Sequence, residues 1–83
     1  MVFYVYVIGS KKKPTRTYVG WTNNLKKRLL KHNLGKGAKF TRGRKWKLKY
    51  FKTYKNKNIA MKEEYKLKKN YKLRKKIKFG DIN

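Results

Sequence analysis

The first twenty residues contain two apolar runs separated by breakers. Residues 2–8 are almost all β-branched or aromatic, which predicts a buried strand rather than a helix. Residues 9–14 combine Gly, Pro and three Lys and predict a turn. Residues 15–19 predict a second strand, so the two runs are expected to pair as an antiparallel hairpin.

A helical spacing follows the hairpin. Residues 22–24 are candidate helix caps, and positions 25, 28, 29 and 32 follow the i, i+3, i+4, i+7 spacing of one helical face. Gly35 is the expected C-terminal stop. Residues 35–44 contain three Gly and four cations with little periodicity, which predicts a flexible basic loop.

A third strand is expected after this loop. Trp46, Leu48 and Tyr50 alternate with lysines, as the residues of a half-buried strand do. The alternation shifts at Phe51, where a β-bulge is the expected cause.

The last third of the chain returns to helical spacing. A helix that begins after residues 56–58 places Ala60, Glu64 and Leu67 on one face. A basic helix over about residues 71–79 completes the order ββαβαα. The pattern predicts a single α+β domain over residues 1–83, with a small, mostly antiparallel three-stranded sheet flanked by helices.

The composition excludes several kinds of active site and metal site. The 83 residues include 27 Lys and Arg but only three Asp and Glu, namely Glu63, Glu64 and Asp81, and there is no Cys. Sites built on clusters of carboxylates, Cys-based zinc sites and thiol chemistry are therefore excluded. The longest apolar run is too short to span a bilayer and lacks the features of a signal peptide, so an intracellular protein without a membrane partner is expected.

The net charge of +24 points to a polyanionic partner. An excess of cations interleaved with aromatic residues is typical of proteins that bind the nucleic-acid backbone and stack on bases. Base composition of the genome could enrich Lys, but it does not explain three acidic residues against 27 basic ones. Charge alone favours a non-catalytic nucleic-acid-binding protein of ribosomal or chromatin type.

A series of short motifs favours a different function. The chain resembles the GIY-YIG endonuclease family over residues 2 to about 70. The resemblance is carried, in order, by the segments Tyr4-Val5-Tyr6, Tyr18-Val19-Gly20, Asn23-Asn24-Leu25-Lys26-Lys27-Arg28, His32-Asn33, the loop of residues 35–44, and Ala60-Met61-Lys62-Glu63-Glu64-Tyr65. Tyr4 and Val19 depart from the name motifs but preserve both strands and both tyrosines.

The resemblance implies a Mg²⁺-dependent DNA endonuclease, with Mn²⁺ as an alternative ion. Tyr18 would be the general base with Tyr6 beside it, Arg28 would bind the scissile phosphate, His32 would contact phosphate or assist proton transfer, and Glu64 would hold the metal. Surrounding positive charge would lower the pKa of a catalytic phenol from its usual value of about 10. The simpler alternatives are packing tyrosines, a solvated arginine, a structural histidine and a glutamate paired with lysine.

The loop of residues 35–44 looks like that of small stand-alone members and of the nuclease subunit that cuts branched DNA. It implies nucleic-acid contacts by Lys36, Lys39, Arg42 and Arg44, with branched or nicked DNA among the candidate substrates and a protein partner as a source of specificity. Without Cys, the zinc module of that subunit is not expected.

Trp21 stands where excision-repair relatives carry a lysine near the base, and Lys39 or Arg42 are the candidates to replace it. A further alternative is that the fold is retained only as a DNA-binding module.

Overall fold

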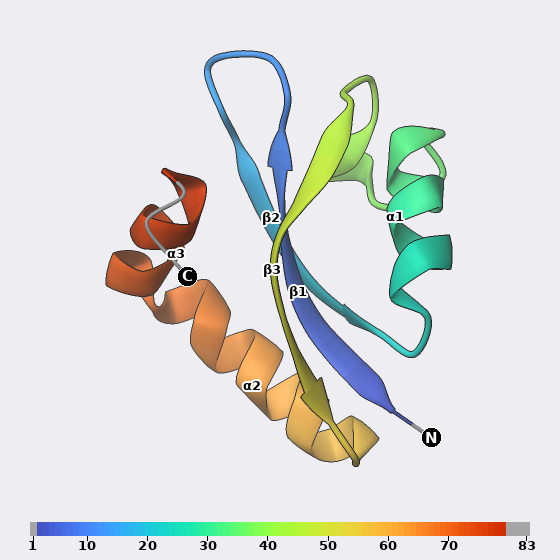
Figure 1. The fold of residues 1–83 in the computed structure, drawn as a ribbon, viewed down its shortest axis with the longest axis vertical. Helices are drawn as coiled ribbons and strands as arrows, with labels where there is room; N and C mark the ends of the chain where they lie inside the picture. The colour runs from blue at the N-terminus through green and yellow to red at the C-terminus, as the bar shows by residue number, and fades with distance from the viewer. Residues whose placement is uncertain (1, 80–83) are drawn as a thin grey trace.

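The computed structural model describes residues 2–79, and its elements follow the predicted order. Figure 1 shows a narrow sheet between two layers of helix. The elements are β1 (Phe3–Ser10), β2 (Thr17–Thr22), α1 (Leu25–Asn33), the 3-10 turn η1 (Lys39–Thr41), β3 (Trp46–Tyr54), α2 (Lys57–Lys69) and α3 (Tyr71–Lys78). The predicted α+β class, the three-stranded antiparallel sheet and the order ββαβαα are confirmed.

The central strand of the sheet is β1. The strand order is β2-β1-β3, and both pairings are antiparallel. Successive side chains of β1 point to opposite faces of the sheet because a strand has a period of two residues. Val5 and Val7 therefore face one side, and Tyr6 and Ile8 face the other.

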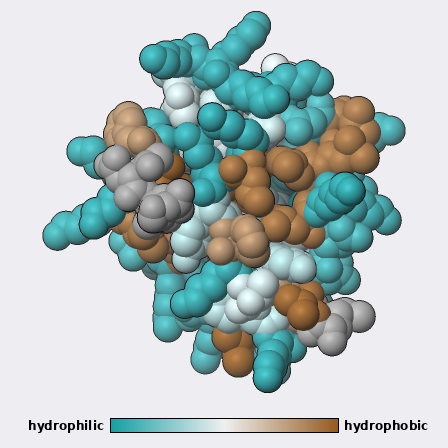
Figure 2. All heavy atoms as spheres, in the orientation of Figure 1, coloured by the Kyte–Doolittle hydropathy of each residue, from teal (hydrophilic) through white to brown (hydrophobic). Residues whose placement is uncertain are grey.

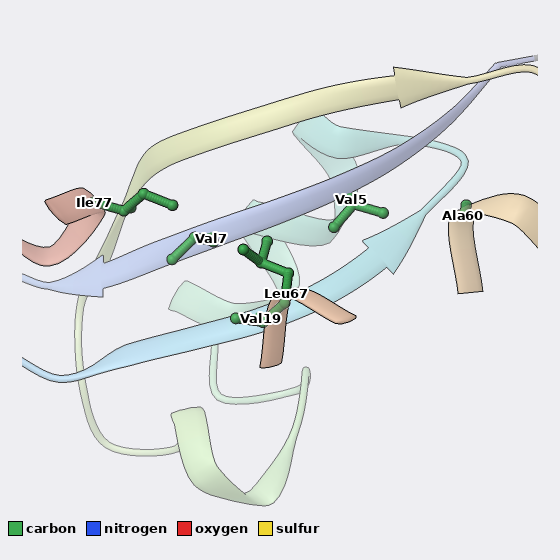
Figure 3. Close-up of a cluster of buried hydrophobic side chains, with 6 residues drawn as sticks. All are labelled: Val5, Val7, Val19, Ala60, Leu67 and Ile77. Atoms are coloured by element: carbon green, nitrogen blue, oxygen red, sulfur yellow. The ribbon is translucent and has the colours of Figure 1, made fainter. Parts of the chain in front are cut away.

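The first face is covered by α2 and α3. Its core contains the aliphatic side chains shown in Figure 3, which are Val5, Val7, Val19, Ala60, Leu67 and Ile77. Ala60 and Leu67 are 0% and 7% exposed, which confirms the predicted inner face of α2. This core holds the helix that carries Glu64 against the sheet.

The second face is covered by α1 and the loop that follows it (Figure 1). Its buried residues are Tyr6, Ile8 and Trp46, with Leu25 and Leu29 of α1 packed against them. The Asn24 side chain caps α1 by accepting from the Lys27 N–H, and the helix stops just before Gly35. Gly35 has φ of 75°, a conformation that favours glycine, so its predicted role as the stop is confirmed.

The β-bulge lies earlier than predicted. Val7 pairs with Tyr50 and Ile8 with Leu48, so Lys49 is the extra residue and the shift does not occur at Phe51. As a consequence, Leu48 packs on the α1 side and Tyr50 on the α2 side. The simple alternation of Trp46, Leu48 and Tyr50 was wrong because a bulge reverses the faces of all residues beyond it.

Figure 2 shows hydrophilic side chains around the margin of one face and hydrophobic residues near its centre. A groove between α1 and β3 is lined in part by Tyr4, Leu25, Leu29, Leu48 and Phe51.

Within residues 2–79, no helix has the length and apolar character needed to cross a membrane.

Candidate active site

The two strand tyrosines lie on the same face of the sheet. Tyr6 pairs with Gly20, and Tyr18 pairs with Ile8, two positions along the same register. A Cβ atom at Gly20 would lie 2.5 Å from the Tyr6 Oη, so only glycine lets the Tyr6 ring lie across β2. The glycine of the second motif is therefore a packing requirement of the tyrosine of the first motif.

Two side chains of α1 meet the Tyr6 hydroxyl. Arg28 Nε donates a hydrogen bond to Tyr6 Oη over 3.3 Å, and His32 Nε2 lies 2.8 Å from the same oxygen. Arg28 and His32 are four residues apart, so the helix presents them from successive turns. These two contacts join the first helix to the first strand at the Tyr6 hydroxyl.

His32 is fully buried, and both of its ring nitrogens contact other protein side chains. Its Nδ1 lies 2.9 Å from Thr41 Oγ1, and a Cβ at Gly37 would clash with its ring. Burial, and secondarily the positive charge of Arg28, lower the pKa of His32 to about 4. At neutral pH His32 is therefore uncharged, and neither ring nitrogen is free for the phosphate contact considered from sequence.

The hydrogen bond between Tyr6 and Arg28 shifts the pKa values of both side chains. Burial raises the pKa of Tyr6, against the lowering effect of the hydrogen bond from Arg28, so Tyr6 stays a neutral phenol. The pKa of Arg28 is raised by the same hydrogen bond and, further, by the nearby Tyr6 and Tyr18 phenols. Arg28 is only partly buried and thus combines a fixed orientation with access to solvent.

Tyr18 lies at the rim of this cluster and is half-buried. Its ring centroid is 5.2 Å from that of His32 and 6.2 Å from that of Phe40, on which it stacks with an interplanar angle of 24°. Phe40 comes from η1 and is 48% exposed. The arrangement places a solvent-accessible phenol beside Arg28, between the buried histidine and the basic loop.

The loop is anchored at its centre, which sequence reasoning did not predict. Thr41 is 0% exposed, its hydroxyl contacts His32, and its carbonyl oxygen accepts from Trp46 Nε1 over 2.9 Å. Lys39 and Arg42 flank this anchor and are exposed. The expected flexible loop is thus tied to the site through one residue, while its cations remain available to a partner.

The two glutamates of α2 diverge. Burial raises the pKa of Tyr6, and the Glu64 carboxylate adds the smallest of the contributions that raise it. Burial also raises the pKa of Tyr54, and the Glu63 carboxylate adds to that shift. Glu64 Oε1 lies 3.6 Å from Lys68 Nζ, and its side chain is 19% exposed. Glu63 pairs with Lys66 at 3.2 Å. Of the two carboxylates, Glu64 is the one that contributes to the pKa of Tyr6.

The donor set suits a weakly held divalent ion. Within the described residues there is no group of three His, Cys, Asp or Glu side chains that could hold a metal ion. Mg²⁺ commonly retains several waters and takes one or two carboxylates together with substrate phosphates. A single half-buried carboxylate at Glu64 fits a site of that kind, and its pair with the half-exposed Lys68 ammonium is weak enough to be displaced.

The family comparison agrees with this geometry. The family model described as the GIY-YIG catalytic domain matches residues 2–78. The chain belongs to the GIY-YIG family. This is a family of nuclease domains, whose members generally use divalent metals and bind DNA.

Several bacterial proteins are similar to this GIY-YIG chain. A UPF0213 protein of Clostridium perfringens is 52% identical over 66 residues, which cover 78% of this chain and 69% of the relative. A UPF0213 protein of Oceanobacillus iheyensis is 47% identical over 66 residues, with coverages of 78% and 74%. The solution NMR structure of a UPF0213 protein of Bacillus halodurans is 36% identical, with a TM-score of 0.51 over 90% of this chain and 81% of that one.

Only some of the GIY-YIG motif residues are in direct contact with one another in the residues that the structure describes. Tyr6, Arg28 and His32 form one hydrogen-bonded cluster, and Tyr18 packs on it. Glu64 makes only the smallest contribution to the raised pKa of Tyr6. Among the predicted nucleic-acid contacts, Lys36, Lys39 and Arg42 are exposed and Arg44 is half-buried.

Trp21 lies on the opposite face from Tyr18. Its ring contacts Phe3, and Lys57 Nζ lies 5.5 Å from its centroid. The sequence did not single out Thr41, although this residue stands inside the basic-loop motif that carried part of the family resemblance.

Proposed function

We propose that this protein is a Mg²⁺-dependent DNA endonuclease that hydrolyses phosphodiester bonds by in-line attack of water. The observation that carries the proposal is the Arg28 guanidinium, held by the Tyr6 hydroxyl beside the half-buried Tyr18. This is a phosphate-binding cation and a candidate base in one place, on a protein whose charge of +24 favours DNA.

Arg28 would bind the scissile phosphate. Its Nε–H is used by Tyr6, and the terminal nitrogens of a guanidinium suit a bidentate contact with phosphate oxygens. Because Arg28 is oriented before substrate arrives, it need not reorganise as negative charge develops on the phosphate.

Tyr18 would accept the proton of the attacking water. Of the two strand tyrosines, Tyr6 is buried with its hydroxyl in contact with Arg28 and His32, whereas Tyr18 is accessible to solvent. The Arg28 guanidinium lies beside Tyr18, which places the candidate base next to the group that would bind the phosphate.

Glu64 would hold the Mg²⁺ ion, which when bound stabilises negative charge on the leaving 3′ oxygen. Mn²⁺ is the alternative ion for the same carboxylate and water ligands. The Glu64 side chain is supported by the packing of α2, because Ala60 and Leu67 on the same helix face are buried against the sheet.

The decisive experiment compares Glu64→Ala with Glu63→Ala. We expect Glu64→Ala to lose cleavage of a labelled panel of duplex, single-stranded, flap and four-way-junction DNA in Mg²⁺ while retaining DNA binding. Glu63→Ala is the matched control, because Glu63 is the neighbouring carboxylate on α2 and also pairs with a lysine. It should cut at the parental rate.

Cleavage by Glu64→Ala at the parental rate would overturn the metal assignment. Tight DNA binding by the parent without cutting, in Mg²⁺ and in Mn²⁺, would instead support the alternative of a fold retained as a DNA-binding module. The panel also identifies the preferred DNA structure, with branched and nicked forms as the first candidates.

The exposed loop cations provide a separate prediction. We expect replacement of Lys36, Lys39 and Arg42 together by Ala to weaken DNA binding and to reduce the slope of log affinity against log salt by about two to three, since each phosphate contact contributes about 0.9. The control replaces the three exposed lysines of residues 11–13. An equal loss in both triple variants, measured by salt titration, would argue against a specific role for the loop.

A further inference from the structure

The hydroxyl of Thr41 determines where the protons of the neighbouring cluster lie. Thr41 Oγ1 is 2.9 Å from the Ala38 carbonyl oxygen, 3.2 Å from the Ala38 nitrogen and 2.9 Å from His32 Nδ1. A carbonyl oxygen only accepts, so the single hydroxyl proton of Thr41 goes to Ala38 O. The Ala38 N–H donates to Thr41, and the third contact requires a proton from the histidine.

His32 therefore carries its proton on Nδ1. Since the ring is neutral, Nε2 is left as an acceptor, and the Tyr6 O–H donates to it over 2.8 Å. The Tyr6 oxygen is then free to accept from Arg28 Nε over 3.3 Å. Every contact in the series from Thr41 through His32 and Tyr6 to Arg28 has one donor and one acceptor.

The opposite tautomer does not satisfy the same contacts. With the proton on Nε2, the Thr41 hydroxyl would have to donate to Nδ1, and its oxygen would face the Ala38 carbonyl at 2.9 Å without a proton between them. The Tyr6 oxygen would receive protons from both Arg28 and His32, and its own proton would have no partner in the cluster. In a site where Tyr6, His32 and Thr41 are all at most 1% exposed, such losses are costly.

We propose that Thr41 is a positioning residue: its hydroxyl selects the Nδ1–H tautomer of His32, which orients the Tyr6 hydroxyl so that its oxygen faces Arg28. The effect on cleavage rests on the proposed function, whereas the tautomer does not. Thr41 belongs to the basic loop, so this series of hydrogen bonds also links the DNA-binding segment to the phosphate-binding arginine.

A purely structural role for Thr41 makes a different prediction. The same hydroxyl bonds both backbone groups of Ala38 and closes the turn η1, so its loss would loosen the loop. That role alone does not require either tautomer of His32. The tautomer is therefore the readout that separates the two roles.

The test is long-range proton–nitrogen NMR of the ¹⁵N-labelled full chain at neutral pH. His32 is the only histidine in the sequence, so its two ring nitrogens are assigned without ambiguity. We expect the Nδ1 of the wild-type protein to carry the proton and Nε2 to show the shift of an unprotonated nitrogen. A wild-type protein with the proton on Nε2 overturns the proposal, whether or not it cuts DNA.

Two variants extend the test to cleavage. Thr41→Ser retains a hydroxyl and should retain the Nδ1–H tautomer and cleavage within about threefold of the parent. Thr41→Val should shift the tautomer toward Nε2–H and lower cleavage by about tenfold or more, the order expected for a displaced positioning group. Thr53→Val, on an exposed position of β3, should change neither.

Unchanged tautomer and cleavage in a folded Thr41→Val protein would overturn the proposal. Should Thr41→Val not fold, the wild-type spectrum and the rescue by serine decide it. A wild-type Nδ1–H tautomer in a protein that cuts no DNA of the panel would support the assignment of Thr41 and count only against the proposed nuclease.

Discussion

Cleavage by an Arg28→Ala variant is expected to fall by about 10²–10³-fold, the usual loss when one preoriented group that stabilises developing negative charge is removed. The guanidinium is held by Tyr6 Oη and lies near Tyr18, so its removal takes the phosphate-binding group away from the candidate base. DNA affinity should fall much less, because the variant still has 26 of the 27 Lys and Arg residues. Single-turnover cleavage and equilibrium binding with the same DNA separate the two effects.

Two controls make the Arg28 result specific. Lys27→Ala removes an exposed cation from the adjacent position of α1 and should leave the rate nearly unchanged. Arg28→Lys preserves the charge but not the Nε hydrogen bond and the bidentate geometry, so it should recover only a small part of the loss. Full activity in Arg28→Lys would mean that charge alone matters, and equal losses in Arg28→Ala and Lys27→Ala would remove Arg28 from the mechanism.

Acidification is expected to destabilise the fold by about 3 kcal/mol through His32 alone. The pKa of His32 is about 4 in the folded protein, against the ordinary histidine value of 6.5, so the unfolded chain binds the proton more readily. The stabilisation is complete above about pH 6.5 and is lost as the pH falls toward 4, because protonation there favours the unfolded state. Stabilities of small domains are about 5–15 kcal/mol, so the loss should be plain in urea titrations at pH 7, 5.5 and 4.

A variant without the titrating group checks the assignment. His32→Gln should be less stable than the parent at pH 7 but should lose much less stability between pH 7 and 4. Glu63→Gln should preserve the parental pH dependence in the upper part of this window, since Glu63 forms a partly exposed ion pair with Lys66. A parent whose stability is the same at pH 7 and pH 4.5 would contradict a buried, neutral His32.

Local patterns were sufficient to predict the elements and several of their ends. The β-branched run at residues 2–8 became β1, and the glycine at position 35 ended α1 in a left-handed conformation. Ala60 and Leu67 are buried on one face of α2 as the helical spacing predicted. These features depend on residues close in sequence, so the chain shows them before any tertiary contact is known.

The position of the β-bulge could not be predicted in the same way. Lys47 and Lys49 look identical in the alternating pattern of β3, but only Lys49 is the extra residue opposite β1. Its Nζ donates to the carbonyl oxygen of Lys78 at the end of α3, and its stem passes over Gly9. The choice between the two lysines depends on contacts with segments far away in the sequence.

For the candidate site, the sequence indicated which residues belong to it but not the charge state of His32. The motif series placed Tyr6, Tyr18, Arg28, His32 and Glu64 in one site before the structure was known, and the structure draws Tyr6, Arg28 and His32 into direct contact. The charge state of His32, by contrast, follows from complete burial under residues that have no local signature.

Local patterns and summed charge were enough to predict the class of fold, the order of its elements and the family, and the net charge of +24 favours an anionic partner. That Glu64 contributes to the pKa of Tyr6, and that Thr41 contacts His32 across the loop, became visible only in the folded chain. The difference arises from how far apart in the sequence the interacting residues are. Periodicity, capping and net charge are properties of neighbouring or summed residues, whereas burial and hydrogen-bond direction depend on which distant groups meet when the chain is packed.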